Sequence, residues 1–179
     1  GRAYTGDDPA FSAHLENITL KAGTQTLKAG LIGGTASGIN YVHIKNCLAE
    51  DGVIVGYDKT QRSIGSFAGS INGTLENCVS YAKVYGTDMV GGIVGGKNQS
   101  MGPMQVWDSS FHGTINATGQ YIGGIIGQGY SSASAPNSPC VSIQNCYVSG
   151  DITGKDYIGG IFGGEPGIYQ CWANGTGYI

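Results

Sequence analysis

The chain has 179 residues, of which 33 are glycine and only 12% are charged. Its formal net charge is −3 and the charges are dispersed, so the sequence predicts neither nucleic-acid binding nor binding to an anionic membrane. Apolar runs stay well below the roughly 18 residues of a membrane-spanning helix, so membrane insertion is not expected. So much glycine disfavours helices. Short β-branched runs between turn residues instead predict an all-β chain.

A glycine-rich block recurs five times along the chain. The copies are KAGLIGGT (28–35), SIGSFAGS (63–70), MVGGIVGG (89–96), YIGGIIGQ (121–128) and YIGGIFGG (157–164). With Lys97 behind it, MVGGIVGG by itself resembles a phosphate-binding loop. Such a loop is needed once per domain and opens a helix, whereas no amphipathic pattern follows here. Five copies therefore indicate a repeated architecture.

Each block has an upstream partner segment that carries Asn, Asp or Gln at one position. These marker residues are Asn17, Asn46, Asn77, Asp108, Asn145 and Gln170. Successive markers are 29, 31, 31, 37 and 25 residues apart, and a period near thirty is typical of stacked repeats.

One unit of this length cannot bury its apolar face alone, so the copies are expected to stack. The prediction is a right-handed parallel β-helix, a solenoid of about five to six coils, because a β-propeller blade needs about forty residues. Residues 1–179 are expected to form one domain within a larger protein. The predicted units are 15–40, 41–73, 74–104, 105–141, 142–167 and an incomplete 168–179.

Two structural columns are predicted beside each other. Asparagine tolerates left-handed backbone geometry and can form a side-chain ladder, so this role falls to Asn46, Asn77, Asp108 and Asn145. The following position holds Cys47, Cys78, Cys146 and Cys171. These thiols are expected to be buried and free, with disulfides and a metal site as less favoured alternatives. Cys140, outside this column, is the expected exposed thiol.

Catalytic patterns are weak. Glu16, Lys45, Glu76, Trp107 and Gln144 fall in one column of mixed type, which is typical of a solvated face. Matching Asp88 and Asp156 are interpreted as turn residues. The three histidines, His14, His43 and His112, are taken to occupy unmatched surface positions, so no metal site is predicted. No cofactor, no catalytic residue and no enzymatic activity are expected.

The repeated pattern N-C-x-x-x-G-x-[IV]-x-G-x-x-x-[IV]-G-G-[IL]-[IVF]-G resembles the GLUG repeats of secreted bacterial proteins. It is clearest over 77–95 and 145–163, and the resemblance covers about residues 15–179. The chain departs from it over 52–62 and at Ser109, where the cysteine is replaced. GLUG repeats occur in surface adhesins and in non-catalytic N-terminal regions of streptococcal-type IgA-cleaving metalloproteases. The resemblance implies a β-helical extracellular module and supplies no catalytic residue.

The expected function is that of a non-catalytic adhesion or stalk module, secreted or on the bacterial cell surface. It would bind host or matrix glycans or glycoproteins, or act as a rigid spacer beside flanking domains of the same chain. Loops and exposed aromatic side chains are the expected ligand-binding elements. The alternatives are a non-catalytic segment of a surface IgA-type metalloprotease and a polysaccharide-active β-helix enzyme. The candidate ligand-binding residues are Tyr57, Arg62, Trp107 and Tyr130.

Overall fold

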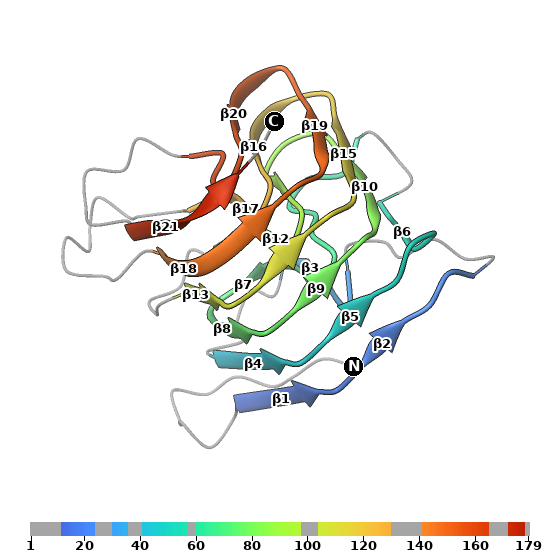
Figure 1. Ribbon diagram of the computed structural model, residues 1–179. Coiled ribbons are helices and arrows are strands. Elements are labelled where there is room, and N and C mark those ends of the chain that lie inside the picture. Colours follow the sequence, from blue (N-terminus) through green and yellow to red (C-terminus); the bar gives the residue numbers. More distant parts are fainter. Residues whose placement is uncertain are drawn as a thin grey trace.

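The computed structural model describes residues 12–23, 30–35, 41–56, 60–97, 104–129, 141–164 and 172–177. These residues form strands and turns and contain no helix, so the all-β prediction is confirmed (Figure 1). Within these ranges, nothing has the length and apolar character of a membrane-crossing helix. The strands lie in four curved parallel sheets, numbered here 1 to 4 in the order in which a repeat passes through them.

Sheet 1 has ten strands, and the other three sheets have three or four each. Sheet 1 contains β1 (Ser12–Glu16), β4 (Tyr41–Lys45), β8 (Gly73–Glu76), β13 (Met104–Trp107), β18 (Val141–Val148) and β21 (Trp172–Gly177), together with β2 (Thr19–Leu20), β5 (Leu48–Ala49), β9 (Val79–Ser80) and β14 (Ser110–Phe111). Sheet 2 contains β6 (Ile54–Val55), β10 (Lys83–Gly86), β15 (Thr114–Ala117) and β19 (Asp151–Thr153). Sheet 3 contains β11 (Val90–Gly91), β16 (Gln120–Gly123) and β20 (Asp156–Gly159). Sheet 4 contains β3 (Ile32–Thr35), β7 (Ala68–Ile71), β12 (Val94–Lys97) and β17 (Ile126–Gln128).

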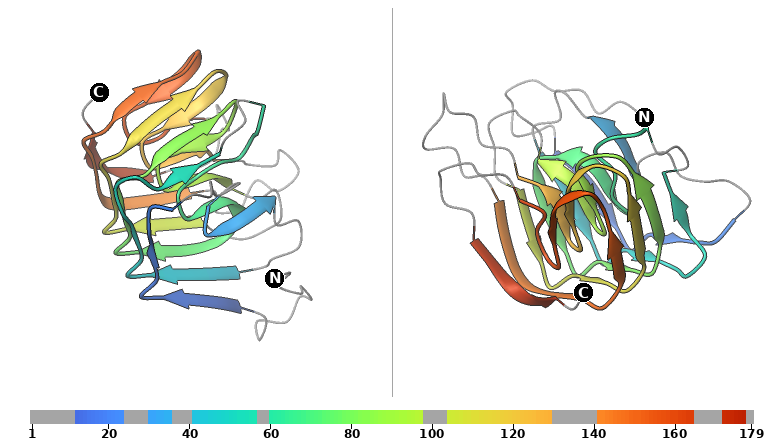
Figure 2. Two further views of the ribbon diagram at one scale, coloured as in Figure 1. Left: turned by 90° about the vertical axis from the view of Figure 1, so that its right-hand side faces the viewer. Right: turned by 90° about the horizontal axis from the view of Figure 1, so that it is seen from above.

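Neighbouring strands in each sheet come from successive repeats. In sheet 1, for example, Glu76 pairs with Lys45 on one side and Trp107 on the other, and Trp107 pairs with Gln144. Figure 2 shows that each pass of the chain lies directly on the one before it. The predicted column of Glu16, Lys45, Glu76, Trp107 and Gln144 is therefore confirmed.

The core is a stack of aliphatic columns. Leu75, Val106 and Ile143 are in register with one another and at most 1% exposed. Val84 and Ile115 continue this pattern in sheet 2, where both are fully buried. Burying one such side chain stabilises the fold by about 1.5–3 kcal/mol. A single repeat lacks the layers above and below it, which explains why the sequence had to repeat.

The glycine blocks make room where the chain passes close to itself. A Cβ on Gly95 would lie 2.3 Å from the backbone nitrogen of Ile64, and one on Gly127 would lie 2.5 Å from that of Val90. Neither glycine has a positive φ, so close backbone approach is the reason for them. The block MVGGIVGG contains β11 and the first residues of β12, so it is part of two sheets.

The predicted asparagine ladder is present. Asn46, Asn77, Asp108 and Asn145 have φ between 51° and 53°. The side-chain amide of Asn77 donates to Asn46 Oδ1 at 2.9 Å, and that of Asn145 donates to Asp108 Oδ1 at 3.1 Å. Asn17 has the same backbone conformation and accepts a bond from Asn46 at 3.2 Å.

A second left-handed column was not predicted. The first residues of four glycine blocks, Ser63, Met89, Tyr121 and Tyr157, have φ between 53° and 62°. The rings of Tyr121 and Tyr157 stack with centroids 5.0 Å apart. Bulky residues rarely adopt this conformation, so the surrounding structure must impose it.

Candidate functional site

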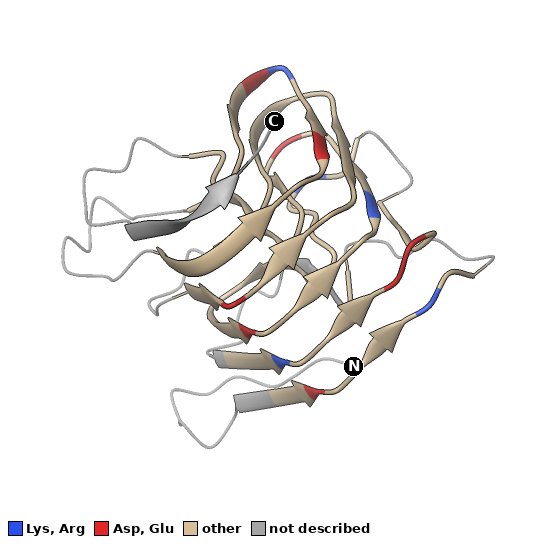
Figure 3. Cartoon of the chain, viewed as in Figure 1, with Lys and Arg blue, Asp and Glu red and all other residues tan. Residues whose placement is uncertain are grey.

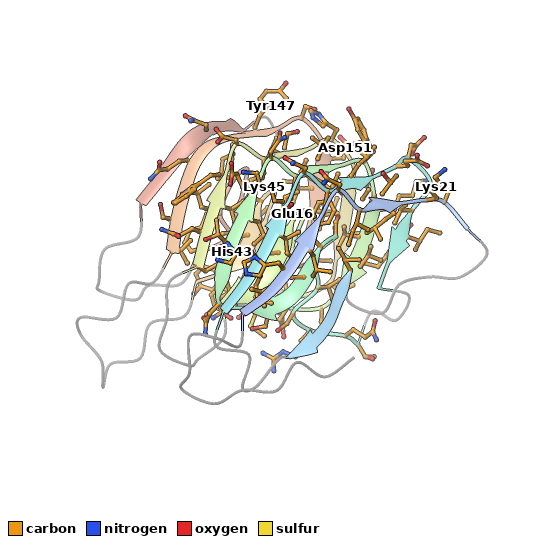
Figure 4. All side chains as sticks on the ribbon, turned by 90° about the horizontal axis from the view of Figure 1, so that it is seen from below. Glu16, Lys21, His43, Lys45, Tyr147 and Asp151 are labelled. Carbon is orange, nitrogen blue, oxygen red and sulfur yellow. The ribbon has the colours of Figure 1, made fainter. Side chains whose placement is uncertain are left out.

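An aromatic cluster covers part of the outer face of sheet 1. It consists of Tyr81, His112 and Tyr147 and is called the aromatic patch below. The ring centroids of Tyr81 and His112 are 5.0 Å apart, and those of His112 and Tyr147 are 5.6 Å apart. Tyr81 is 43% exposed and Tyr147 is 39% exposed. Figure 4 shows Tyr147 pointing away from the sheet.

Strand alternation places these side chains outside. Ser80, Phe111 and Val148 form one register and are fully buried, so the adjacent side chains point to the opposite face. Tyr81 and His112 follow the first two, and Tyr147 precedes the third. Large inward residues such as Phe111 therefore fix the outward direction of the patch.

Two serine hydroxyls hold the His112 ring. Its Nδ1 lies 2.7 Å from Ser149 Oγ, and its Nε2 lies 3.0 Å from Ser110 Oγ. In a neutral imidazole one nitrogen donates and the other accepts, so both contacts can be hydrogen bonds. A serine beside a histidine also occurs in nucleophilic catalysis, where a third group, often a carboxylate, orients the base. Here a serine hydroxyl lies within hydrogen-bonding distance of each ring nitrogen of His112. This arrangement favours ligand binding over nucleophilic catalysis.

Arg62, a predicted ligand residue, is tied into a column that links successive repeats. Its Nε lies 3.1 Å from Asp88 Oδ2, and the Arg62 side chain is 64% exposed. Asp88 Oδ1 accepts a hydrogen bond from the backbone N–H of Gln120 at 2.8 Å. The Gln120 amide donates to Asp156 Oδ2 at 3.3 Å. Asp88 and Asp156 therefore connect repeats, and the exposed ion pair contributes less than about 1 kcal/mol.

Trp107, another predicted ligand residue, is half-buried on the outer face of sheet 1 between Glu76 and Gln144. Its indole Nε1 is buried and forms no hydrogen bond with any described residue. Arg62 lies elsewhere, two residues before the bridge that joins Ile64 to Val90 in sheet 3. The structure therefore does not bring Arg62 and Trp107 together. Tyr57 and Tyr130 lie outside the described residues.

His14 and His43 contradict the prediction that the histidines are unmatched. They are register partners in β1 and β4, and their rings stack with centroids 4.8 Å apart and an interplanar angle of 3°. The pKa of His43 is lowered chiefly by burial and secondarily by the charge of His14, while Glu76 opposes the shift. In the sequence, His14 and His43 each stand three residues before a marker asparagine, and that spacing was the missed signal.

The same alignment could have revealed the aromatic patch. Tyr81 and His112 each stand four residues after their markers, and so does Ser149. Comparison of marker offsets would therefore have placed Tyr81, His112 and Ser149 in one outward column. Tyr147 stands only two residues after its marker and reaches His112 diagonally, so its contact depends on the three-dimensional structure.

The thiol column is buried, as predicted. Cys47, Cys78 and Cys146 are free and at most 2% exposed, whereas Cys140 and Cys171 lie outside the described residues. Burial is the main reason that the pKa of Cys78 rises to about 12 and that of Cys146 to about 11. Nucleophilic attack requires the thiolate, so Cys78 and Cys146 are inert near neutral pH.

The charged side chains do not gather into one site. Figure 3 shows acidic and basic residues scattered over the described part of the chain. Lys45 Nζ and Glu76 Oε1 form an ion pair at 2.9 Å, and the hydrogen bond to Glu76 is the main reason that the pKa of Lys45 is raised. Among the described residues there is no group of three or more His, Cys, Asp or Glu side chains able to hold a metal ion.

No known protein family, curated protein or solved structure matches this chain. The aromatic patch and the repeat architecture therefore provide the basis for a functional proposal.

Proposed function

We propose that this chain is a non-catalytic, extracellular adhesion or stalk module of a large bacterial surface protein. Its fold would be a right-handed parallel β-helix of about five to six coils. Parallel in-register pairing between successive repeats supports the β-helix, and crossovers between parallel strands are nearly always right-handed. The GLUG-like sequence pattern supports the extracellular assignment.

The observation that carries the proposal is the continuity of the side-chain columns. Aliphatic side chains stack in the core, while Asn46, Asn77 and Asn145 each donate to the repeat below at the corner. The described repeats are thereby fixed to their neighbours by packing and by backbone hydrogen bonds, and the corner side chains add hydrogen bonds at three of these junctions. Such a stack would hold attached domains at a set distance, as a stalk must.

The aromatic patch favours adhesion to glycans over a purely passive stalk. Tyr81 and Tyr147 offer apolar ring surface together with phenol groups, a combination that suits sugars. Ser110 and Ser149 hold His112 between them, so the cluster is ordered before a ligand arrives. We propose that host or matrix glycans or glycoproteins bind here. Tyr57, Arg62, Trp107 and Tyr130 are a second proposed binding set.

An array of host glycans and matrix glycoproteins tests this proposal. The native chain should bind saturably, and Tyr147→Ala should weaken binding by about tenfold, since one aromatic contact is worth about 1 kcal/mol or more. Tyr85→Ala is the matched control, because Tyr85 lies in β10 of sheet 2, away from the patch. Ile125→Asp, at a fully buried position, provides a misfolded control.

If the folded native chain binds nothing on the array, the adhesion proposal is wrong and only the stalk proposal remains. Equal weakening by Tyr147→Ala and Tyr85→Ala would place the binding site elsewhere. A non-catalytic segment of an IgA-type metalloprotease would behave like a stalk in this assay, and only its flanking domains would distinguish it.

A polysaccharide-active enzyme is the alternative from a different class. Such enzymes commonly use two carboxylates near the scissile bond. Asp88 and Asp156 both contact Gln120, but the two oxygens of Asp88 already accept bonds from Arg62 and Gln120. We therefore expect no release of reducing ends from a panel of polysaccharides. Release that disappears in Asp88→Asn would favour the enzyme.

A further inference from the structure

The stacked histidines form a pair of potential metal ligands on the outer face of sheet 1. His14 and His43 lie directly opposite each other in parallel register, so their side chains project in the same direction. Their ring centroids are 4.8 Å apart, which matches the spacing of the strands beneath them. His14 is exposed and His43 is half-buried, so an ion can reach the pair from solvent.

From this geometry we propose that His14 and His43 together bind one divalent transition-metal ion of the nickel, copper or zinc type. Imidazole nitrogens bind such ions at about 2.0–2.1 Å, so two nitrogens on one ion lie roughly 3 Å apart. The rings stack face to face with centroids 4.8 Å apart, so both must turn until their in-plane lone pairs converge on the ion and the two nitrogens come within that distance. Side chains at a solvent-facing position can make this movement by rotation about χ1 and χ2.

Local charge also favours a cation at this position. A neutral imidazole ring has one nitrogen with an in-plane lone pair, which is the atom that binds a metal ion. Among the described residues, the charged groups beside the pair are Glu16, Lys45 and Glu76, which occupy the adjacent outward column. Lys45 is paired with Glu76 at 2.9 Å, so these three groups together leave one net negative charge.

The chemistry of the ligands sets the expected selectivity. Imidazole suits nickel, copper and zinc, whereas calcium and magnesium require a set of oxygen ligands. With two protein ligands and water in the other positions, affinity should increase from Mn²⁺ through Co²⁺ to Ni²⁺. The ion would also join β1 to β4, so its binding should stabilise the first described repeat. The site lies on different strands from the aromatic patch and does not depend on what that patch binds.

Calorimetric titration of the untagged chain with Ni²⁺ at neutral pH tests the site. The native chain should bind one equivalent. Loss of a supporting group outside the ligand set already reduces affinity about 10- to 100-fold, so His14→Gln and His43→Gln should each weaken binding at least about tenfold. His112→Gln is the matched control, because that ring is held by two serines in a different column. Its titration should equal that of the native chain.

Thermal unfolding separates a lost site from a lost fold. Without metal, His43→Gln should melt within a few degrees of the native chain, and Ni²⁺ should raise only the native melting temperature. Cys140→Ser should leave Ni²⁺ binding unchanged. The site is refuted if the native chain fails to bind Ni²⁺ at millimolar concentration. Equal affinity in the native, His14→Gln and His43→Gln chains would also refute it, as would loss of binding in Cys140→Ser.

Discussion

Two corners of the repeat adopt the same left-handed backbone conformation with different residues. At the asparagine corner the position holds Asn or Asp in every described repeat. At the glycine-block corner it holds Ser63, Met89, Tyr121 or Tyr157. The left-handed conformation costs roughly 1–2 kcal/mol for an ordinary L-residue and less for Asn or Asp. At the first corner the residue type itself lowers the cost of the left-handed conformation, and at the second corner it does not.

The glycine-block corner is held by its neighbours. The Met89 N–H donates to the carbonyl of Gln120 at 2.9 Å, and the Met89 carbonyl accepts from Ile64 at 3.1 Å. The backbone of Met89 also lies close to Gly127, where a Cβ would be 2.6 Å from the Met89 carbonyl carbon. Contacts between repeats therefore impose the left-handed conformation at the glycine-block corner, whereas at the asparagine corner the residue type favours it. Substitutions at the two corners should separate these causes.

The largest effect is expected where a glycine permits the close approach. In Gly95→Ala the new Cβ would lie 2.3 Å from the Ile64 nitrogen and 2.5 Å from the Gly69 carbonyl oxygen. Both partners are backbone atoms, so the free energy of unfolding should fall by about 3 kcal/mol. In Gly96→Ala the nearest atom is the Gln128 oxygen at 3.2 Å, and the loss should stay below about 1 kcal/mol. Denaturant unfolding measures both variants. Equal losses of unfolding free energy would show that the close backbone approach at Gly95 does not determine the conformation of the glycine-block corner.

The thiols next to the asparagine corner should make stability fall in alkaline solution. The pKa of Cys78 is raised from its ordinary value near 9 to about 12 in the folded chain, so the folded state holds its proton more tightly. This contribution is complete below pH 9 and is lost between pH 9 and 12, on the order of 2 kcal/mol by pH 11. Urea unfolding from pH 8 to 11 measures the slope. Cys78→Ser removes this thiol and should reduce the slope of stability against pH. The variant should still fold, since Ser109 shows that a hydroxyl fits this column. An identical slope in the variant would contradict the assignment to Cys78.

Asp108 interrupts the asparagine ladder, and Asp108→Asn should complete it. The ionised carboxylate accepts from Asn145 but has no hydrogen to donate to Asn77. An amide can do both, so stability should rise by about 1 kcal/mol, the usual contribution of a hydrogen bond. Asp151→Asn removes the same charge from an exposed position outside the ladder and should change little. A gain of the same size in both variants would assign the effect to net charge.

The smallest effect tests whether the second corner accepts the residue of the first. Met89→Asn should raise stability by roughly 0.5 kcal/mol, because the lower left-handed cost of Asn outweighs the lost contacts of a half-buried methionine. Val79→Asn introduces the same residue on the outer face of strand β9 and should lose stability. Thermal unfolding compares the two variants. A loss in Met89→Asn as large as in Val79→Asn would show that the left-handed cost is negligible at this corner.

The same contrast explains what the sequence predicted. The left-handed conformation of Asn46, Asn77 and Asn145 was predictable because asparagine tolerates it. The thirty-residue period then placed Cys47, Cys78 and Cys146 in one column. The residue types of Met89 and Tyr121 do not predict a left-handed backbone conformation, because that conformation arises from contacts between repeats.

The pairing of His14 with His43 and the alignment of Tyr81 with His112 were readable from the marker spacing and were missed. The diagonal contact from His112 to Tyr147 required the structure, because the two residues occupy different register positions.

A spin-label distance between Glu16 and Gln144 tests the stacked register most directly. Both side chains are exposed and belong to one column, four strand spacings apart, which corresponds to about 19 Å between the two Cα atoms. The labels are introduced at these two positions after Cys140 and Cys171 are replaced by serine. Stacking in register predicts a narrow distance distribution centred near 20 Å. A broad distribution, or one centred beyond about 30 Å, would contradict it.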